Sequence, residues 1–92
     1  MESTVTLASI SIAQLRAARA FLDWSMGKAA AAAGVTRRTV IRLEREPGYK
    51  DRQPKSLVRL VEAYRRASPA IVFIEGGVRP GAGTYVEVQQ LR

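Results

Sequence analysis

The sequence predicts a mainly helical domain followed by a small C-terminal β-hairpin or strand pair, and three observations lead to this prediction. Across residues 10–68, apolar residues recur at spacings of three and four, which is the period of a helix with one buried face. Capping residues and glycines divide this region into four segments. Two β-branched and aromatic runs then follow, joined by a connection rich in Gly and Pro. We therefore expect an N-terminal tail (1–9), a helical domain (10–68) and a C-terminal β extension (69–92).

Composition narrows the class of protein. The chain has 92 residues, of which 47% are hydrophobic, and this suits one small globular domain. No apolar run approaches the roughly 18 residues of a membrane span, and the N-terminus lacks the features of a secretion signal, so we expect a cytoplasmic protein. Cysteine and histidine are both absent from the sequence. Because these residues supply the usual metal ligands and acid–base catalysts, we expect no metal, no cofactor and no enzymatic activity.

The first helix has a well-marked start. Ser11 is the expected N-cap, Gln14 completes a capping box, and Ile10 and Leu15 occupy the positions of a hydrophobic staple. The helix is predicted to end near residues 23–24. Its spacing predicts a buried face made of Ile12, Leu15, Ala18, Phe21 and Leu22.

Residues 25–45 are predicted to form two short helices joined by a tight turn. Ser25 caps a helix that runs through residue 33, Gly34 ends it in a left-handed conformation, and Thr36 caps the next helix. Val40 and Leu43 are expected to point inward. The outer face of this third helix then carries Arg37, Arg38, Ile41, Arg42 and Arg45.

The remaining elements are less sharply defined. Residues 47–55 are predicted to be a polar loop, and a fourth helix is expected from about Ser56 to Ala67. Its apolar face consists of Leu57, Leu60, Val61 and Tyr64. Strands are predicted over 70–75 and 84–88, with a loop between them. We expect Trp24 in the core and assign no role to Tyr49.

Positive charge is concentrated in the helical region. The formal net charge is +7, and residues 16–66 contain 13 Lys and Arg against 5 Asp and Glu. A basic surface suits a polyanionic partner, but it serves solubility equally well, so charge alone does not decide between the two.

The two helices of residues 25–45 match the layout of a helix-turn-helix unit, in which a short glycine-containing turn joins two helices. A helix that carries arginines in its first turns suits the major groove of DNA, where guanidinium groups pair with guanine edges and with phosphates. DNA binding is therefore the leading hypothesis.

Residues 12–67 resemble the helix-turn-helix domain of the phage Cro and repressor family, also called the xenobiotic-response-element family. The resembling positions are Ser25–Met26, Ala30, Gly34–Val35–Thr36, Thr39–Val40 and Leu43–Glu44. The resemblance implies a four-helix lambda-repressor-like domain that acts as a transcriptional regulator on specific double-stranded DNA, with residues 36–45 as the recognition helix.

The resemblance also assigns roles to individual side chains. Three positions reach base edges in the family: Arg37, Arg38 and Arg42. Two further positions resemble phosphate contacts, Lys28 and Thr36. An ion pair between Glu44 and Arg19 is implied as a structural contact. The chain departs from the family at Met26, where Gln is usual, and at Ala29, where a larger aliphatic residue is usual.

Basic residues of the loop over 47–55 extend the expected DNA contacts. We assign phosphate contacts to Lys50, Arg52 and Lys55, with an ordinary solvated loop as the alternative.

The C-terminal strands leave two arrangements open. They can pack on the first and fourth helices, or they can pair across a two-fold axis in a homodimer, which we favour. A dimer would place two recognition helices about one DNA turn (roughly 34–36 Å) apart. The alternative function is an antitoxin-type interaction module whose C-terminal strands bind a partner protein, with or without DNA binding.

Overall fold

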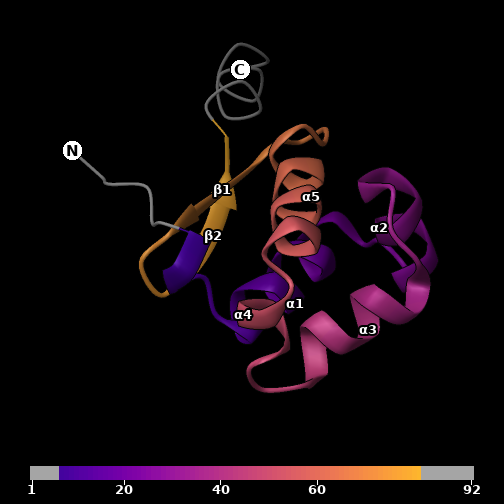
Figure 1. Ribbon diagram of the computed structural model, residues 1–92. Coiled ribbons are helices and arrows are strands. Elements are labelled where there is room, and N and C mark those ends of the chain that lie inside the picture. The colour runs from indigo at the N-terminus through magenta and orange to yellow at the C-terminus, as the bar shows by residue number, and fades with distance from the viewer. Residues whose placement is uncertain (1–6, 82–92) are drawn as a thin grey trace, which may run out of the picture.

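The computed structural model describes residues 7–81 and confirms a mainly helical fold with a small C-terminal sheet (Figure 1). A 3₁₀ turn, η1, comes first. The elements and their bounds are η1 (Leu7–Ser9), α1 (Ile12–Leu22), α2 (Met26–Ala33), α3 (Arg37–Arg45), α4 (Tyr49–Arg52), α5 (Pro54–Arg65), β1 (Ile71–Ile74) and β2 (Gly77–Pro80). Within the described part of the chain, none of these helices has the length and apolar character needed to cross a bilayer.

The helix boundaries follow the capping residues of the sequence. Ser11 and Gln14 form the expected capping box, with Ser11 N donating to Gln14 Oε1 at 2.8 Å and Gln14 N donating to Ser11 Oγ at 3.1 Å. Ser25 and Thr36 cap α2 and α3. Gly34 ends α2 at a φ of 70°. Because each cap satisfies an amide that the helix leaves free, local sequence alone sets these helix starts.

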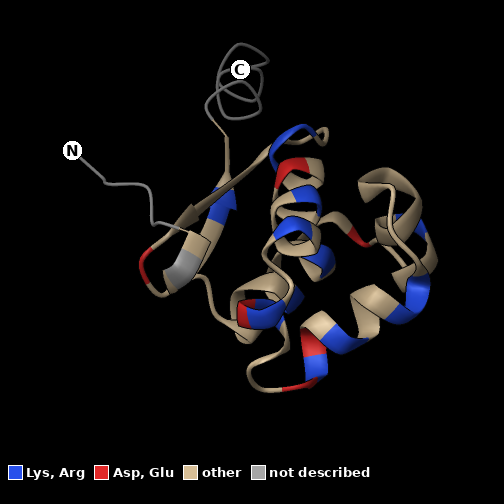
Figure 2. Cartoon of the chain, viewed as in Figure 1, with Lys and Arg blue, Asp and Glu red and all other residues tan. Residues whose placement is uncertain are grey.

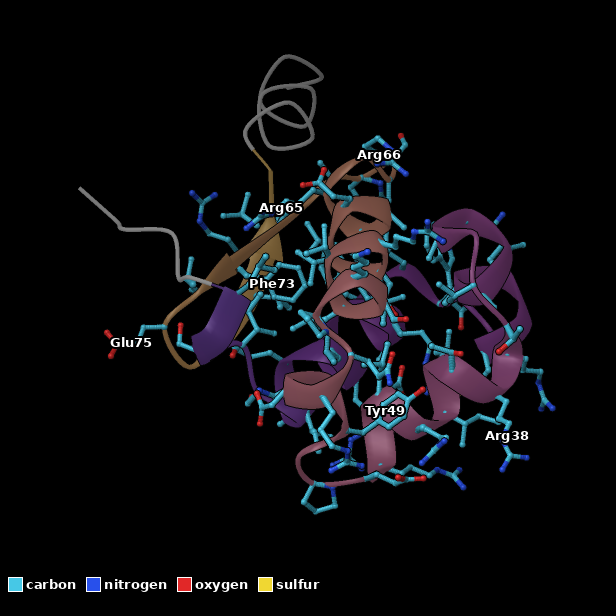
Figure 3. All side chains as sticks on the ribbon, in the orientation of Figure 1. Arg38, Tyr49, Arg65, Arg66, Phe73 and Glu75 are labelled. Carbon is cyan, nitrogen blue, oxygen red and sulfur yellow. The ribbon has the colours of Figure 1, made fainter. Side chains whose placement is uncertain are left out.

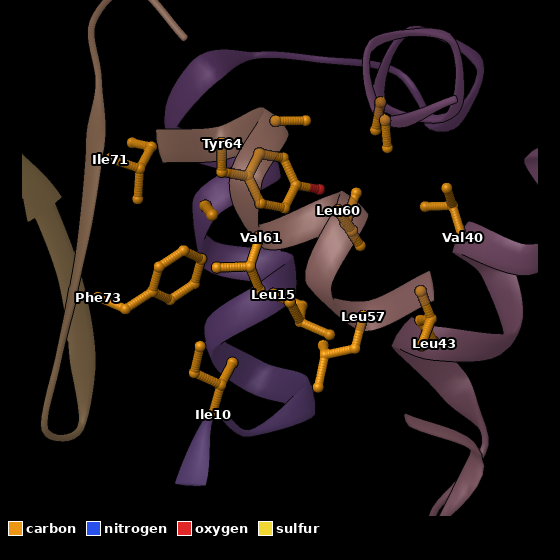
Figure 4. Packing of buried hydrophobic residues seen from close by; sticks show 14 of the residues in the cluster. Ile10, Leu15, Val40, Leu43, Leu57, Leu60, Val61, Tyr64, Ile71 and Phe73 are labelled. Atoms are coloured by element: carbon orange, nitrogen blue, oxygen red, sulfur yellow. The ribbon is translucent and has the colours of Figure 1, made fainter. Parts of the chain in front are cut away.

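The core forms around α5, which contacts α1, α2, α3, α4 and β1. Figure 4 shows the four predicted residues of α5 pointing into it: Leu57, Leu60, Val61 and Tyr64. The ring of Tyr64 lies 5.8 Å from that of Trp24 and 6.3 Å from that of Phe73, measured between centroids. Trp24, which was predicted to lie in the core, is partly buried and packs against it.

The strands β1 and β2 form an antiparallel hairpin that packs on the helices. Ile71 lies opposite Pro80, and Ile74 lies opposite Gly77. Ile71 and Phe73 are buried in the common core, β1 contacts α5, and β2 contacts α1. Figure 1 shows the hairpin on one side of α1 and α5, with α2 and α3 on the other side. Residues 71–80 therefore pack on the helices of the same chain, which is one of the two arrangements considered for the C-terminal strands.

A buried glutamine joins the hairpin to α1. Gln14 Nε2 donates to the carbonyl oxygens of Ile74, at 2.5 Å, and Gly77, at 3.0 Å, at the two ends of the hairpin turn. Gln14 is only 5% exposed, whereas Phe21, which we expected in the core, is 47% exposed. Helical periodicity gives the direction of a buried face, but the covering element decides how far along the helix burial extends.

The second strand lies elsewhere than predicted. The structure has β2 at 77–80, inside the segment that we expected to be a loop. Gly77 and Pro80 are poor strand formers, so this segment has no local strand signal. Its pairing with β1 across a turn at Gly76, whose φ is 81°, brings it into the sheet. The strand predicted over 84–88 lies outside the described residues.

The segment expected to be a loop over 47–55 is partly helical. It contains the four-residue helix α4, in which Tyr49 is buried, and α5 begins at Pro54, two residues earlier than predicted. Proline suits the first helical position because that position needs no amide hydrogen bond.

Candidate nucleic-acid interface

The unit formed by α2 and α3 is closely packed. Three alanines of α2 are buried between the helices: Ala29, Ala30 and Ala33. After Gly34, Val35 N donates to Ala30 O at 3.1 Å and closes the end of α2. An added Cβ at Gly34 would meet no atom within 4 Å, so the positive φ, and not crowding, favours glycine here.

An ion pair between a partly exposed arginine and a buried carboxylate joins α1 to α3. Arg19 Nε and Nη2 donate to the two carboxylate oxygens of Glu44 at 2.8 and 3.0 Å, and Arg19 Nη1 donates to the carbonyl of Trp24 at 3.0 Å. Glu44 is 1% exposed. The hydrogen bond to Glu44 raises the pKa of Arg19. This pair, which the family resemblance implied, fixes the position of α3 relative to the rest of the domain.

A buried hydroxyl lies near this pair. Within the described residues, Tyr64 Oη is buried and has no hydrogen-bond partner. Burial, with the negative charge of Glu44 as a second cause, raises the pKa of Tyr64. The phenol therefore stays neutral in the folded protein.

Several cations of α2 and α3 are exposed. Arg37 and Arg38 are exposed on the first turn of α3, and Lys28 is exposed on α2. Figure 3 shows Arg38 extending away from the body of the protein. Thr36 Oγ1 accepts from Thr39 N at 3.1 Å and shares a hydrogen bond with Thr39 Oγ1 at 2.9 Å. The hydroxyl of Thr36 thus already serves the helix cap, and its predicted phosphate contact stays a prediction.

Arg42 is held differently from Arg37 and Arg38. Its Nε donates to Glu46 Oε2 at 2.7 Å and its Nη2 to Glu46 Oε1 at 3.0 Å, while its Cζ lies 4.3 Å from the centroid of the Tyr49 ring. The hydrogen bond raises the pKa of Arg42 and lowers that of Glu46. Sequence reasoning missed Glu46 and Tyr49, although the four-residue spacing of Arg42 and Glu46 is a recognisable helix-pair signal.

The three basic residues assigned to phosphates differ in exposure. The Lys50 side chain is only 13% exposed and pairs with Asp51 at 3.3 Å. Arg52 and Lys55 are exposed, at the end of α4 and the start of α5. Figure 2 shows basic positions along α3, α4 and α5, with acidic positions scattered among them. The structure thus presents Arg52 and Lys55 to solvent more fully than Lys50.

Comparison with protein families, with curated proteins and with solved structures finds no match to this chain.

Proposed function

We propose that this chain is a transcriptional regulator that binds specific double-stranded DNA and inserts α3 into the major groove. The main support for the proposal is that the outer face of α3 is exposed while its inner face is held by the domain. Its first turn exposes Arg37 and Arg38, while the Arg19–Glu44 pair and the α2 packing hold its inner face. A rigid helix with free guanidinium groups at its N-terminal end meets the geometric need of base readout in the major groove.

The surroundings of α3 supply cations for the DNA backbone. Lys28, Arg52 and Lys55 are exposed, and the N-terminus of α3 adds the positive end of a helix dipole. Contacts of this kind bind phosphates without regard to sequence and make affinity fall with salt. In the proposal they position the protein, and the arginines of α3 select the sequence.

A homodimer is part of the proposal. One recognition helix of nine residues reads a short half-site, and two copies related by a two-fold axis would read a palindrome. Light scattering at micromolar concentration, with and without DNA, measures the number of copies.

The proposed function is tested by selection from random-sequence duplexes with the purified full chain. We expect enrichment of half-sites that contain guanine, because arginine pairs with guanine O6 and N7. Recovery of an unenriched pool, or enrichment of single-stranded nucleic acid over duplex, would overturn the proposal.

A further inference from the structure

Arg42 and Glu46 form a two-bonded ion pair on the surface of α3. The Nε and Nη2 groups of Arg42 each donate to one carboxylate oxygen of Glu46. Two parallel N–H···O bonds are the strongest form of this contact, and they occupy an edge of the guanidinium that would otherwise serve a bidentate contact with guanine or phosphate. The pair therefore occupies the Nε–Nη2 edge of Arg42, one of the two edges through which a guanidinium makes bidentate contacts.

An aromatic ring holds the same guanidinium on its face. Arg42 Cζ lies 4.3 Å from the ring centroid of Tyr49, well within the range of a cation–π contact. Tyr49 is 8% exposed, and its place in the core fixes the ring. Figure 3 shows the Tyr49 ring among the side chains near α3. The guanidinium of Arg42 is thus held by Glu46 at one edge and by the Tyr49 ring against its face.

Glu46 lies among cations on the surface proposed to face DNA. Arg52 Nη2 is 4.0 Å from Glu46 Oε1. The pKa of Glu46 is lowered first by the hydrogen bond from Arg42 and further by the positive charges of Arg42, Arg52 and Arg38. The carboxylate is therefore ionised at neutral pH, and it acts as an anion built into a basic surface.

We propose that Glu46 competes with DNA for Arg42 and thereby limits the strength of DNA binding. The inference rests on the proposed function. Paired with Glu46, Arg42 brings no net charge to the phosphates, and its Nε–Nη2 edge is not available to the bases. Base readout then falls to Arg37 and Arg38, and Glu46 is the residue that keeps a third arginine from strengthening binding to any sequence.

The test compares four full-length proteins on a duplex enriched by the wild type and on a random-sequence duplex pool. The variants are Glu46→Gln, the double variant Arg42→Met/Glu46→Gln, and the matched control Glu62→Gln. The control makes the same change on a partly exposed glutamate of α5 that pairs with Arg65 and Arg66, which are not proposed to contact DNA. Dissociation constants are measured by fluorescence anisotropy over a range of salt concentrations, and folding is checked by circular dichroism.

Glu46→Gln is expected to tighten binding about tenfold on both DNAs and to steepen the salt dependence by about one counterion, because one more cation reaches a phosphate. Glu62→Gln is expected to change affinity less than about threefold, because its partners Arg65 and Arg66 are not among the residues proposed to contact DNA. The double variant is expected to bind within about threefold of the wild type, because two neutral side chains replace a pair without net charge.

A Glu46→Gln protein that binds no more tightly than Glu62→Gln would overturn this inference and leave the proposed function standing. So would a double variant that binds about tenfold more weakly than the wild type, because Arg42 would then contact DNA while paired. A wild type that binds neither DNA overturns the proposed function, and this inference falls with it. A wild type that binds both DNAs equally, but tightens in Glu46→Gln, overturns sequence specificity and supports the competition.

Discussion

Arg38 carries the clearest prediction at the scale of single residues. It is exposed on the first turn of α3, and Arg38→Ala should reduce discrimination at one base pair of the selected site by about 1–3 kcal/mol while leaving other positions unchanged. Repeating the duplex selection with the variant measures this effect. Arg66→Ala is the control, because Arg66 is exposed at the end of α5. A variant of Arg38 with an unaltered sequence preference would remove it from base readout.

Tyr64 offers a prediction about stability. Its buried hydroxyl has no partner among the described residues, and a buried polar group without a hydrogen bond costs free energy. Tyr64→Phe keeps the ring contacts with Trp24 and Phe73 and should raise the free energy of unfolding by about 1 kcal/mol. Urea denaturation monitored by circular dichroism gives the difference. A loss of stability on this change would mean that the hydroxyl has a stabilising partner.

At the scale of elements, the Arg19–Glu44 pair is expected to hold α3 in place. Arg19→Met leaves the Glu44 carboxylate buried without its partner and should cost about 3 kcal/mol of stability. Arg19→Met/Glu44→Leu should recover most of this loss, because no unpaired charge remains buried. Arg16→Met, on the exposed side of α1, is the matched control. Equal losses in the single and double variants would show that packing, and not the charge, matters here.

The elements also show which parts of the fold could be predicted from sequence. Ser11, Ser25 and Thr36 each act within one helical turn, so a local pattern suffices to predict the helix starts that the structure confirms. The strand over 77–80 depends on its partner β1 and on the hydrogen bonds from Gln14. No local pattern contains that information, and the residues appeared typical of a loop.

Only part of the candidate site could be predicted from the sequence, as was the case for the fold. The two-helix unit and the exposure of Arg37 and Arg38 follow from helical periodicity. The restraint on Arg42 does not, because it requires the short helix α4 to bring Tyr49 against α3. A residue's position on a helix face therefore predicted its exposure to solvent but not its freedom to contact a ligand.

At the scale of the whole molecule, a net charge of +7 predicts that binding to any duplex will weaken steeply as the salt concentration rises. Charge alone therefore separates the proposed regulator poorly from a merely basic protein. The distinguishing quantity is the ratio of affinities for specific and random DNA, measured at one salt concentration.

The most direct test of the central claim is that ratio, measured by fluorescence anisotropy with the wild-type chain near physiological salt. One duplex carries the sequence enriched by selection, and the other carries the same bases in shuffled order. Sequence readout by α3 predicts binding at least about 1,000-fold tighter to the enriched duplex. Equal and salt-sensitive binding to both duplexes would contradict it and would leave α3 as part of a basic surface without sequence readout.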